Sequence, residues 1–223
     1  MNTQDRTSKT VAILGNGVVG TTLGQGFAEI GYQVVFGTRD ASSSKTRAAL
    51  GAVRNSRAAS PDEAAAAGSL AVLALPWLGL EAGILTAGAH NFAGKLVIDP
   101  SNPLDFSGDV PTWAIGQAGS AGELVQHLLP QAKVVKAFNT VTAAHMVHPR
   151  LPDGTPDMFI AGDDAQAKAQ VAQILKGFGW REPIDAGPIG ASRLLEALAM
   201  LWVLYGVRND HWTHAFSLLG RKS

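Results

Sequence analysis

The sequence predicts an α/β fold, in which a doubly wound and mainly parallel sheet is covered by helices and followed by a small C-terminal helical extension. Short apolar runs alternate along the chain with segments whose apolar residues recur every three or four positions, as strands alternate with helices in this class. The run at residues 69–75 is apolar on both faces, which is typical of a strand buried inside a parallel sheet. A glycine-rich turn, residues 15–20, joins the first apolar run to the first periodic segment.

The bulk composition excludes several classes of protein. The chain has 223 residues, 46% hydrophobic and 16% charged, which is enough apolar material for one large domain or a domain with a smaller appendage. Lys plus Arg and Asp plus Glu each number 18, so there is no basic excess to bind a nucleic acid or an anionic membrane. The absence of cysteine excludes disulfides, thiolate metal sites and cysteine nucleophiles.

The apolar stretches predict a soluble, cytoplasmic protein with no membrane span. Residues 1–9 are polar and lack the apolar core of a signal peptide. The stretch 64–80 is interrupted by glycine, serine and proline. The stretch 197–207 has only about half of the roughly 20 residues that a span requires.

The glycine-rich turn has the pattern G-x-G-x-x-G between a predicted strand, residues 11–14, and a predicted helix, residues 21–30. It consists of Gly15, Asn16, Gly17, Val18, Val19 and Gly20. The first glycine permits a tight turn, the second lets the backbone approach a pyrophosphate, and the third brings helix against strand. The positive end of the helix then faces the phosphates. We therefore expect a dinucleotide here.

The end of the second predicted strand, residues 33–36, indicates which dinucleotide. An NAD site usually places a carboxylate here for the ribose hydroxyls, whereas this strand leads into Thr38 and Arg39. A hydroxyl and a guanidinium can hold a 2′-phosphate, which a carboxylate would repel. Asp40 follows one residue later. The pattern favours NADP over NAD; Lys45 and Arg47, in the next helix, either add positive charge or are simply solvated.

The remaining elements continue the alternation. Ser60, Pro61 and Glu63 form a helix start with a capping box. After it we expect strands at 69–75, 95–98, 133–137, 158–161 and 181–185, and helices ending near Ala89 and spanning 120–129, 164–178 and 192–205.

Ligands of doubly wound sheets bind beyond the carboxyl ends of the strands. Leu75, Pro76 and Trp77 end one predicted strand and should border the cofactor. Residues 99–103 and 138–140 follow two more. The loop that continues from 99 to about Gly116 is long and rich in proline and glycine, so it is a candidate wall of the substrate cleft.

The C-terminal part differs in character from the rest. We expect a dinucleotide-binding domain at 1–185 and a helical segment at 186–223. The helix at 192–205 is apolar around most of its circumference and must be buried on several sides; its apolar residues are Leu194, Leu195, Leu198, Leu201, Trp202 and Leu204. A further apolar stretch lies at 216–219. A single chain would struggle to cover both, so the sequence predicts a homodimer.

The order of these motifs resembles the NADP-dependent oxidoreductases typified by the coenzyme F420 (deazaflavin):NADP reductases. The cytosolic domain of the transmembrane ferric reductases looks similar. The matching runs are 15–20, 37–39, 75–77, 136–140, 162–164 and 185–193, and they span nearly the whole chain. The last run is the most specific, because a generic Rossmann protein has no reason to carry it.

The resemblance implies a set of cofactor contacts. The glycine turn would bind pyrophosphate, and Thr38 and Arg39 the 2′-phosphate. Pro76 and Trp77 would lie along the cofactor, and Asn102, Pro103 and Asn139 near the nicotinamide. The archaeal deazaflavin reductases have His at the position of Asn139, and the family commonly has a basic residue soon after the strand-end Arg, where this chain has serines at 42–44.

Hydride transfer between two cofactors needs little from side chains beyond alignment and exclusion of water. The chain fits this demand, since no acid–base constellation stands out. The leading hypothesis is hydride transfer between NADP(H) and coenzyme F420, FMN, FAD or a similar planar acceptor. Alternatives are a reductase of a small carbonyl or imine, with Lys136 or a histidine as acid, and a non-catalytic NADP-binding module that reports redox state.

Two histidine pairs, His145/His148 and His211/His214, have the spacing of neighbours on a helix. A metal site would need further ligands, and no carboxylate is spaced to supply them, so no metal is expected. Hydrolase and phosphotransferase motifs do not occur.

Overall fold

The computed structural model of the protein describes residues 9–108, 110–115 and 119–220. Most of the polar start, residues 1–8, and Gly116, the expected end of the long loop, lie outside these ranges.

Eight strands form one sheet within the described residues, in the order β10-β9-β8-β5-β4-β1-β2-β3. The strands are β1 (Thr10–Leu14), β2 (Gln33–Gly37), β3 (Ser56–Ala59), β4 (Leu70–Leu73), β5 (Leu96–Asp99), β8 (Lys133–Lys136), β9 (Phe159–Gly162) and β10 (Ile184–Asp185). In this order, the six neighbouring strands β8, β5, β4, β1, β2 and β3 run parallel to one another. β9 is antiparallel to β8, and β10 is parallel to β9, so these two strands run the opposite way. The predicted doubly wound, mainly parallel sheet is confirmed.

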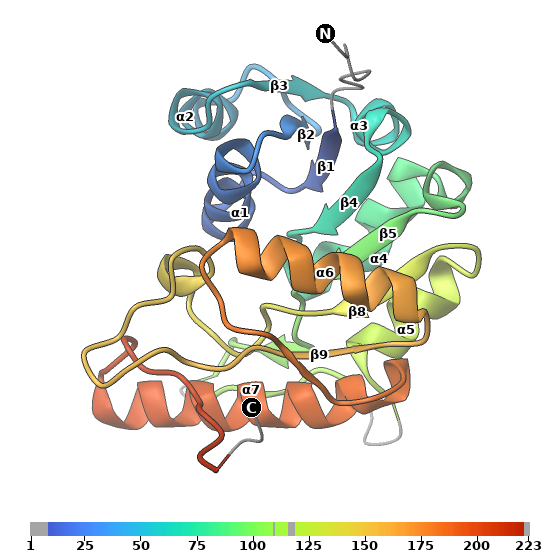
Figure 1. Ribbon diagram of the computed structural model, residues 1–223. Helices are drawn as coiled ribbons and strands as arrows, with labels where there is room; N and C mark the ends of the chain where they lie inside the picture. Colours follow the sequence, from blue (N-terminus) through green and yellow to red (C-terminus); the bar gives the residue numbers. More distant parts are fainter. Residues whose placement is uncertain (1–8, 109, 116–118, 221–223) are drawn as a thin grey trace, which may run out of the picture.

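Helices cover both faces of the sheet. They are α1 (Val18–Glu29), α2 (Ser44–Ala52), α3 (Pro61–Ala67), α4 (Trp77–Ala87), α5 (Ala121–Leu128), α6 (Ala165–Gly177) and α7 (Ser192–Asn209). Figure 1 shows α1 and α2 on one side of β1 and β2, and α3 on the other. Two apolar cores lie against the sheet: one packs α1, α2 and α6 on it around Phe27 and Phe178, and the other packs α3, α4 and α5 around Leu80 and Val125.

The main differences from the sequence prediction concern β3, the long loop and α1. β3, at the edge of the sheet, was not expected, because Ser56 and Arg57 give its sequence no apolar run. The long loop contains a short hairpin, β6 (Leu104–Asp105) paired with β7 (Thr112–Trp113). α1 begins at Val18, inside the glycine turn, instead of residue 21. The predicted capping box is present, with the Ser60 N–H donating to the Glu63 carboxylate at 3.1 Å.

Helix α7 is buried where it meets α5 and β9 and where it meets the hairpin and the C-terminal segment, and it is exposed elsewhere. One side packs on the hairpin and the C-terminal segment through Met200, Trp202 and Val203. The other side leaves Leu194 66% and Leu201 58% exposed. The single chain therefore leaves one side of this apolar helix open, and its cover by a second copy stays a prediction.

The stretch Ile189–Asn209, which contains α7, is long and apolar enough to cross a membrane by length and composition alone. The apolar stretch is therefore longer than residues 197–207, the bounds that the sequence pattern indicates. A mostly buried core helix passes the same test, and 44% of an 18-residue part of this stretch is buried inside the fold. α7 lies along the bottom of the view in Figure 1, beside β9. The absence of a membrane span stays a prediction.

Candidate functional site

The carboxyl ends of the parallel strands share one edge of the sheet. The glycine turn follows β1, Thr38 and Arg39 follow β2, residues 74–77 follow β4, residues 100–103 follow β5, and residues 137–140 follow β8. The chain winds away in opposite directions from β1 and β4, which are neighbours. Such a switch point is where doubly wound folds bind ligands. The structure therefore brings every predicted site residue to one edge.

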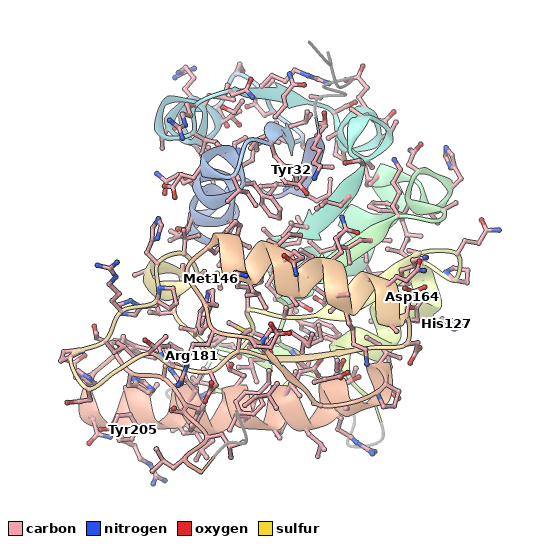
Figure 2. The ribbon with its side chains drawn as sticks, in the orientation of Figure 1. Tyr32, His127, Met146, Asp164, Arg181 and Tyr205 are labelled. Atoms are coloured by element: carbon pink, nitrogen blue, oxygen red, sulfur yellow. The ribbon has the colours of Figure 1, made fainter. Side chains whose placement is uncertain are left out.

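Two of the runs that carry the resemblance lie at the opposite edge. Because β9 and β10 run against the other strands, residues 162–164 and 185–191 emerge near the beginning of β8. The ion pair between Lys133 and Asp164, 3.0 Å, marks that edge. In Figure 2, Asp164 and Met146, which follows β8, lie on opposite sides of the view.

The glycine turn is closed on its inner side. Gly15 has φ +104°, and a β-carbon there would lie 2.2 Å from the Ala74 carbonyl oxygen. A β-carbon on Gly20 would lie 2.1 Å from the Gly15 carbonyl oxygen. Only glycine fits at these two positions.

The outer side of the turn is open. A β-carbon on Gly17 would meet only the end of the Lys45 side chain, its Nζ 3.8 Å away. Gly17 is the N-cap of α1, where no side chain caps the free N–H groups and no acidic residue lies in the first turn. Free N–H groups and the helix dipole suit an anion. The turn therefore has the form that a pyrophosphate needs.

Lys45 lies beside this opening, although it belongs to α2. Its ammonium reaches the second glycine of the turn from an exposed position. Sequence reasoning left Lys45 undecided between a ligand-binding and a solvated cation. Lys45 follows the serines at 42–44, and its reach to the turn depends on how α2 packs.

A polar network joins the glycine turn to the end of β2. Thr46 is fully buried, accepts from the Asn16 amide at 2.7 Å and donates to the Asp40 carbonyl oxygen at 2.7 Å. The Thr38 hydroxyl lies 3.4 Å from it. Thr46 thereby fixes the distance between the turn and the strand end, a role that the sequence pattern did not indicate.

The carboxylate of Asp40 is turned into its own loop. It accepts from the Ser42 N–H at 2.8 Å and from the Ser42 hydroxyl at 2.6 Å. These bonds hold the pKa of Asp40 below its ordinary value. The guanidinium of Arg39 is exposed beside the half-buried Thr38. The strand end therefore presents a cation and a hydroxyl, with the carboxylate occupied elsewhere.

The residues after β4 form one wall of the edge. Leu75 and Trp77 are half-buried against the second core, and Pro76 is exposed as the N-cap of α4. Their neighbours Val18 and Leu78 are the apolar residues most open to solvent nearby, at 75% and 89% exposed.

The asparagines after β5 and β8 bind each other. The Asn102 side-chain amide donates to the Asn139 carbonyl oxygen at 2.8 Å, and the Asn139 amide donates to Asn102 Oδ1 at 3.0 Å. Asn139 also donates to the Leu195 carbonyl oxygen of α7 at 3.0 Å. Asn139 and Pro103 are buried, and Asn139 Oδ1 has no protein partner. A buried oxygen without a partner suits a site where a ligand or water donates to it.

Directly beneath this pair lies a buried ion cluster. Lys136 Nζ is 2.7 Å from Asp99 Oδ2, 2.8 Å from Glu196 Oε1 and 2.7 Å from the Ser101 carbonyl oxygen. Burial by itself lowers the pKa of Lys136, but the two carboxylates outweigh it and raise the pKa, so the amine stays charged. Burial raises the pKa of Glu196, which Lys136 and two backbone N–H donors offset in part.

Lys136 therefore does not fit the role of a proton donor to substrate. An ammonium has three hydrogens, and three protein oxygens lie within hydrogen-bonding distance of this one. Glu196 was missed from the sequence, although it is the one acidic residue in the apolar stretch 192–209.

The histidine pairs do not converge on a common point. His148 pairs with Glu29 at 2.7 Å, and the His214 ring stacks on Trp202. In the part of the chain that the structure describes, no group of three or more His, Asp or Glu side chains could hold a metal ion.

A family model and a solved structure point to the same family. Residues 10–103 match the family model described as NADP oxidoreductase, coenzyme F420-dependent. The crystal structure of a candidate F420-dependent NADP reductase from Arthrobacter sp. FB24 superposes with a TM-score of 0.87 at 36% identity, covering 94% of this chain and 98% of that one.

Two curated relatives match over shorter stretches. Metalloreductase STEAP3 of Rattus norvegicus is 33% identical over 50% of this chain and 21% of its own length. The F420-dependent NADP reductase of Methanocaldococcus jannaschii is 31% identical over 63% of each chain. The chain thus spans about a fifth of the first relative and less than two thirds of the second.

Proposed function

Because the chain belongs to the family of coenzyme F420-dependent NADP oxidoreductases, and is thus an NADP-dependent oxidoreductase, we propose that it transfers a hydride between NADP(H) and a deazaflavin of the coenzyme F420 class. FMN, FAD or another planar acceptor is the wider class. The observation that carries the proposal is the strand edge, where an open glycine turn, a Thr38–Arg39 strand end and a buried asparagine pair lie together, above a Lys136 amine that is held by three protein oxygens.

The proposed cofactor contacts follow the edge from β2 to β8. The glycine turn and α1 hold the pyrophosphate, with Lys45 beside it. Thr38 and Arg39 hold the 2′-phosphate. Leu75, Pro76 and Trp77 lie along the dinucleotide, because they line the edge between the turn and the end of β5.

Asn102, Pro103 and Asn139 complete the proposed contacts at the nicotinamide end. The free Asn139 Oδ1 accepts from an amide N–H there, and the buried Pro103 limits the water that reaches the reacting carbon.

The chain's own residues bind and orient the cofactor and exclude water, and Lys136 donates no proton to the substrate. NADP(H) supplies the hydride chemistry when bound. A reductase of a small carbonyl or imine would need a positioned acid, and the engaged Lys136 does not offer one. This argues against the imine or carbonyl alternative with Lys136 as its acid.

Several broader features remain part of the proposal. Residues 1–185 form the cofactor-binding part, and residues 186–223 add the helical segment that closes the acceptor side. The exposed face of α7, with Leu194, Leu201 and Tyr205, packs against a second copy in a homodimer. We place the protein in the cytoplasm, with a small-molecule acceptor and neither nucleic acid nor membrane as partner.

The test is anaerobic stopped-flow mixing of NADPH with coenzyme F420, FMN, FAD and quinones, following loss of the reduced nicotinamide. The proposal expects fast transfer to coenzyme F420, with NADH much slower as the matched control. Turnover of small imines or carbonyls alone would favour the other reductase reading. Tight NADPH binding without any turnover would favour a redox-sensing module instead.

A further inference from the structure

Four elements meet on the side chain of Lys136. Asp99 ends β5, Lys136 ends β8, and Glu196 comes from the second turn of α7. Glu196 also accepts from the N–H groups of Ala121 and Gly122 at 3.0 and 3.1 Å, and so caps α5. The side chains of the three charged residues are at most 1% exposed.

The same amine holds the loop that leads to Asn102. Ser101 is gripped at both of its backbone groups: its N–H donates to Asp99 Oδ1 at 2.9 Å, and its carbonyl oxygen accepts from Lys136 at 2.7 Å. Asn102 is the next residue and binds Asn139 in both directions. A shift of the Ser101 carbonyl would therefore move the asparagine pair.

The backbone just before Asn139, the other residue of the pair, is strained. Phe138, fully buried between Lys136 and Asn139, has φ +65°, which a bulky side chain rarely adopts. Its N–H donates to Met158 Sδ at 3.2 Å. Strained backbone persists only where the surroundings over-determine it, and such positions cluster at functional sites.

Packing is tight enough to fix the cluster in one arrangement. A β-carbon on Gly122 would lie 2.3 Å from the Ser192 hydroxyl oxygen and 3.2 Å from Lys136 Cε, so α5 and α7 approach each other as closely as glycine allows. Burying an ion cluster is an expensive way to join elements, since apolar residues of similar volume often stabilise a fold as well or better. Stability alone is therefore a weak reason for this cluster.

We propose that Lys136 is a positioning residue for hydride transfer, which holds Asn102 and Asn139 in place through the Ser101 carbonyl and the Asp99–Glu196 ion cluster. The inference rests on the proposed function in placing the asparagine pair at the nicotinamide. Lys136 acts through these neighbours and exchanges no proton during the reaction.

The test compares Lys136→Met with a triple variant, Asp99→Asn/Lys136→Met/Glu196→Gln. The single change leaves two buried carboxylates without their partner, whereas the triple change removes all three charges and keeps an acceptor for the Ser101 N–H and one for α5. Lys133→Met is the matched control: it removes an ion-paired lysine from the other end of the same strand. Circular dichroism and melting curves identify which variants are folded.

Single-turnover kinetics with NADPH and with NADPH deuterated at the transferred position supply the first readout. A misplacement of about 1 Å can slow a reaction about 100-fold. We expect the triple variant to transfer hydride at least about tenfold more slowly, with the NADPH dissociation constant changed less than about threefold and a larger isotope effect on turnover. Lys133→Met should leave all three quantities unchanged.

The proposal is overturned if the triple variant transfers hydride within about twofold of the wild-type rate. It is also overturned if the transfer rate and the NADPH affinity of the triple variant fall together while the isotope effect stays unchanged, because this is the result that mere loss of folded protein gives. A wild-type protein inactive with every acceptor would refute the proposed function separately. In that case the fluorescence emission of bound NADPH tests the positioning role. We expect the emission in the triple variant to differ from that in wild type and in Lys133→Met, and identical emission in all three proteins would overturn the role.

Discussion

Replacing either of two cations near the glycine turn should change the affinities for NADPH and NADH in different ways. Lys45 lies beside Gly17, where the pyrophosphate is proposed, and Arg39 lies at the end of β2, where the 2′-phosphate is proposed. NADPH and NADH share the pyrophosphate, and only NADPH has the 2′-phosphate. Lys45→Met should therefore weaken both dinucleotides alike, whereas Arg39→Ala should weaken NADPH far more than NADH.

The size of each effect follows from the setting of the charge. Two unit charges about 4 Å apart attract by about 1 kcal/mol in water and about 4 kcal/mol at an effective dielectric constant near 20. Lys45 is exposed, so about 1–2 kcal/mol applies, or about 5- to 30-fold in dissociation constant. A guanidinium bound to a phosphate contributes about 1.5–3 kcal/mol, which makes the Arg39 effect on NADPH about 10- to 150-fold.

Fluorescence titration of NADPH and NADH at low and high salt measures these quantities. Arg54→Met is the control, because it removes one exposed positive charge just beyond the far end of α2. Added salt should shrink the Lys45 effect, since exposed charges are screened. The reasoning is refuted if Lys45→Met discriminates between the two dinucleotides, or if Arg39→Ala weakens both equally.

Four further outcomes are expected. Gly20→Ala should reduce NADPH affinity more than tenfold, as its β-carbon would meet the Gly15 carbonyl at 2.1 Å, whereas Gly51→Ala in α2, with nothing within 4 Å, should leave it unchanged in the same titration. Ser60→Ala should lower the melting temperature by about 2–4 °C in calorimetry, since losing an N-cap costs about 1 kcal/mol in a chain of this size. Asn139→Asp should lower it as well and slow hydride transfer, because a carboxylate cannot donate to Asn102 and Leu195; a variant with normal rate and stability would contradict the pairing. Leu201→Glu should convert the proposed dimer to a monomer in analytical ultracentrifugation, and a monomeric wild-type protein at micromolar concentration would refute the dimer.

The sequence predicts this fold well where backbone chemistry alone decides the structure. The glycine turn is such a case, because Gly15 and Gly20 are required by contacts with the neighbouring backbone. The buried strands β1 and β4 are equally predictable from the sequence, because a short run that is apolar on both faces is typical of a strand inside a parallel sheet. The sequence does not predict β3 (Ser56–Ala59), because an edge strand needs no apolar side chains to pair with its neighbour.

The site is less predictable because its key contacts join distant parts of the chain. Lys45 approaches the glycine turn only through the packing of α2. Lys136 looks like a polar residue at a strand end until Asp99 and Glu196 are seen around it. A lone acidic residue in an apolar helix is a usable signal for a buried ion pair, but it does not name the partner.

The most specific run of the resemblance acts at a distance from the proposed cofactor. Residues 185–191 lie at the edge opposite the glycine turn, where Asp185 accepts from the Gly187 N–H at 2.9 Å and Asp163 accepts from the Ile189 N–H at 2.9 Å. These bonds fix the turn that starts α7, and α7 then carries Glu196 back to Lys136. The run thereby determines where α7 begins, and hence where Glu196 reaches Lys136.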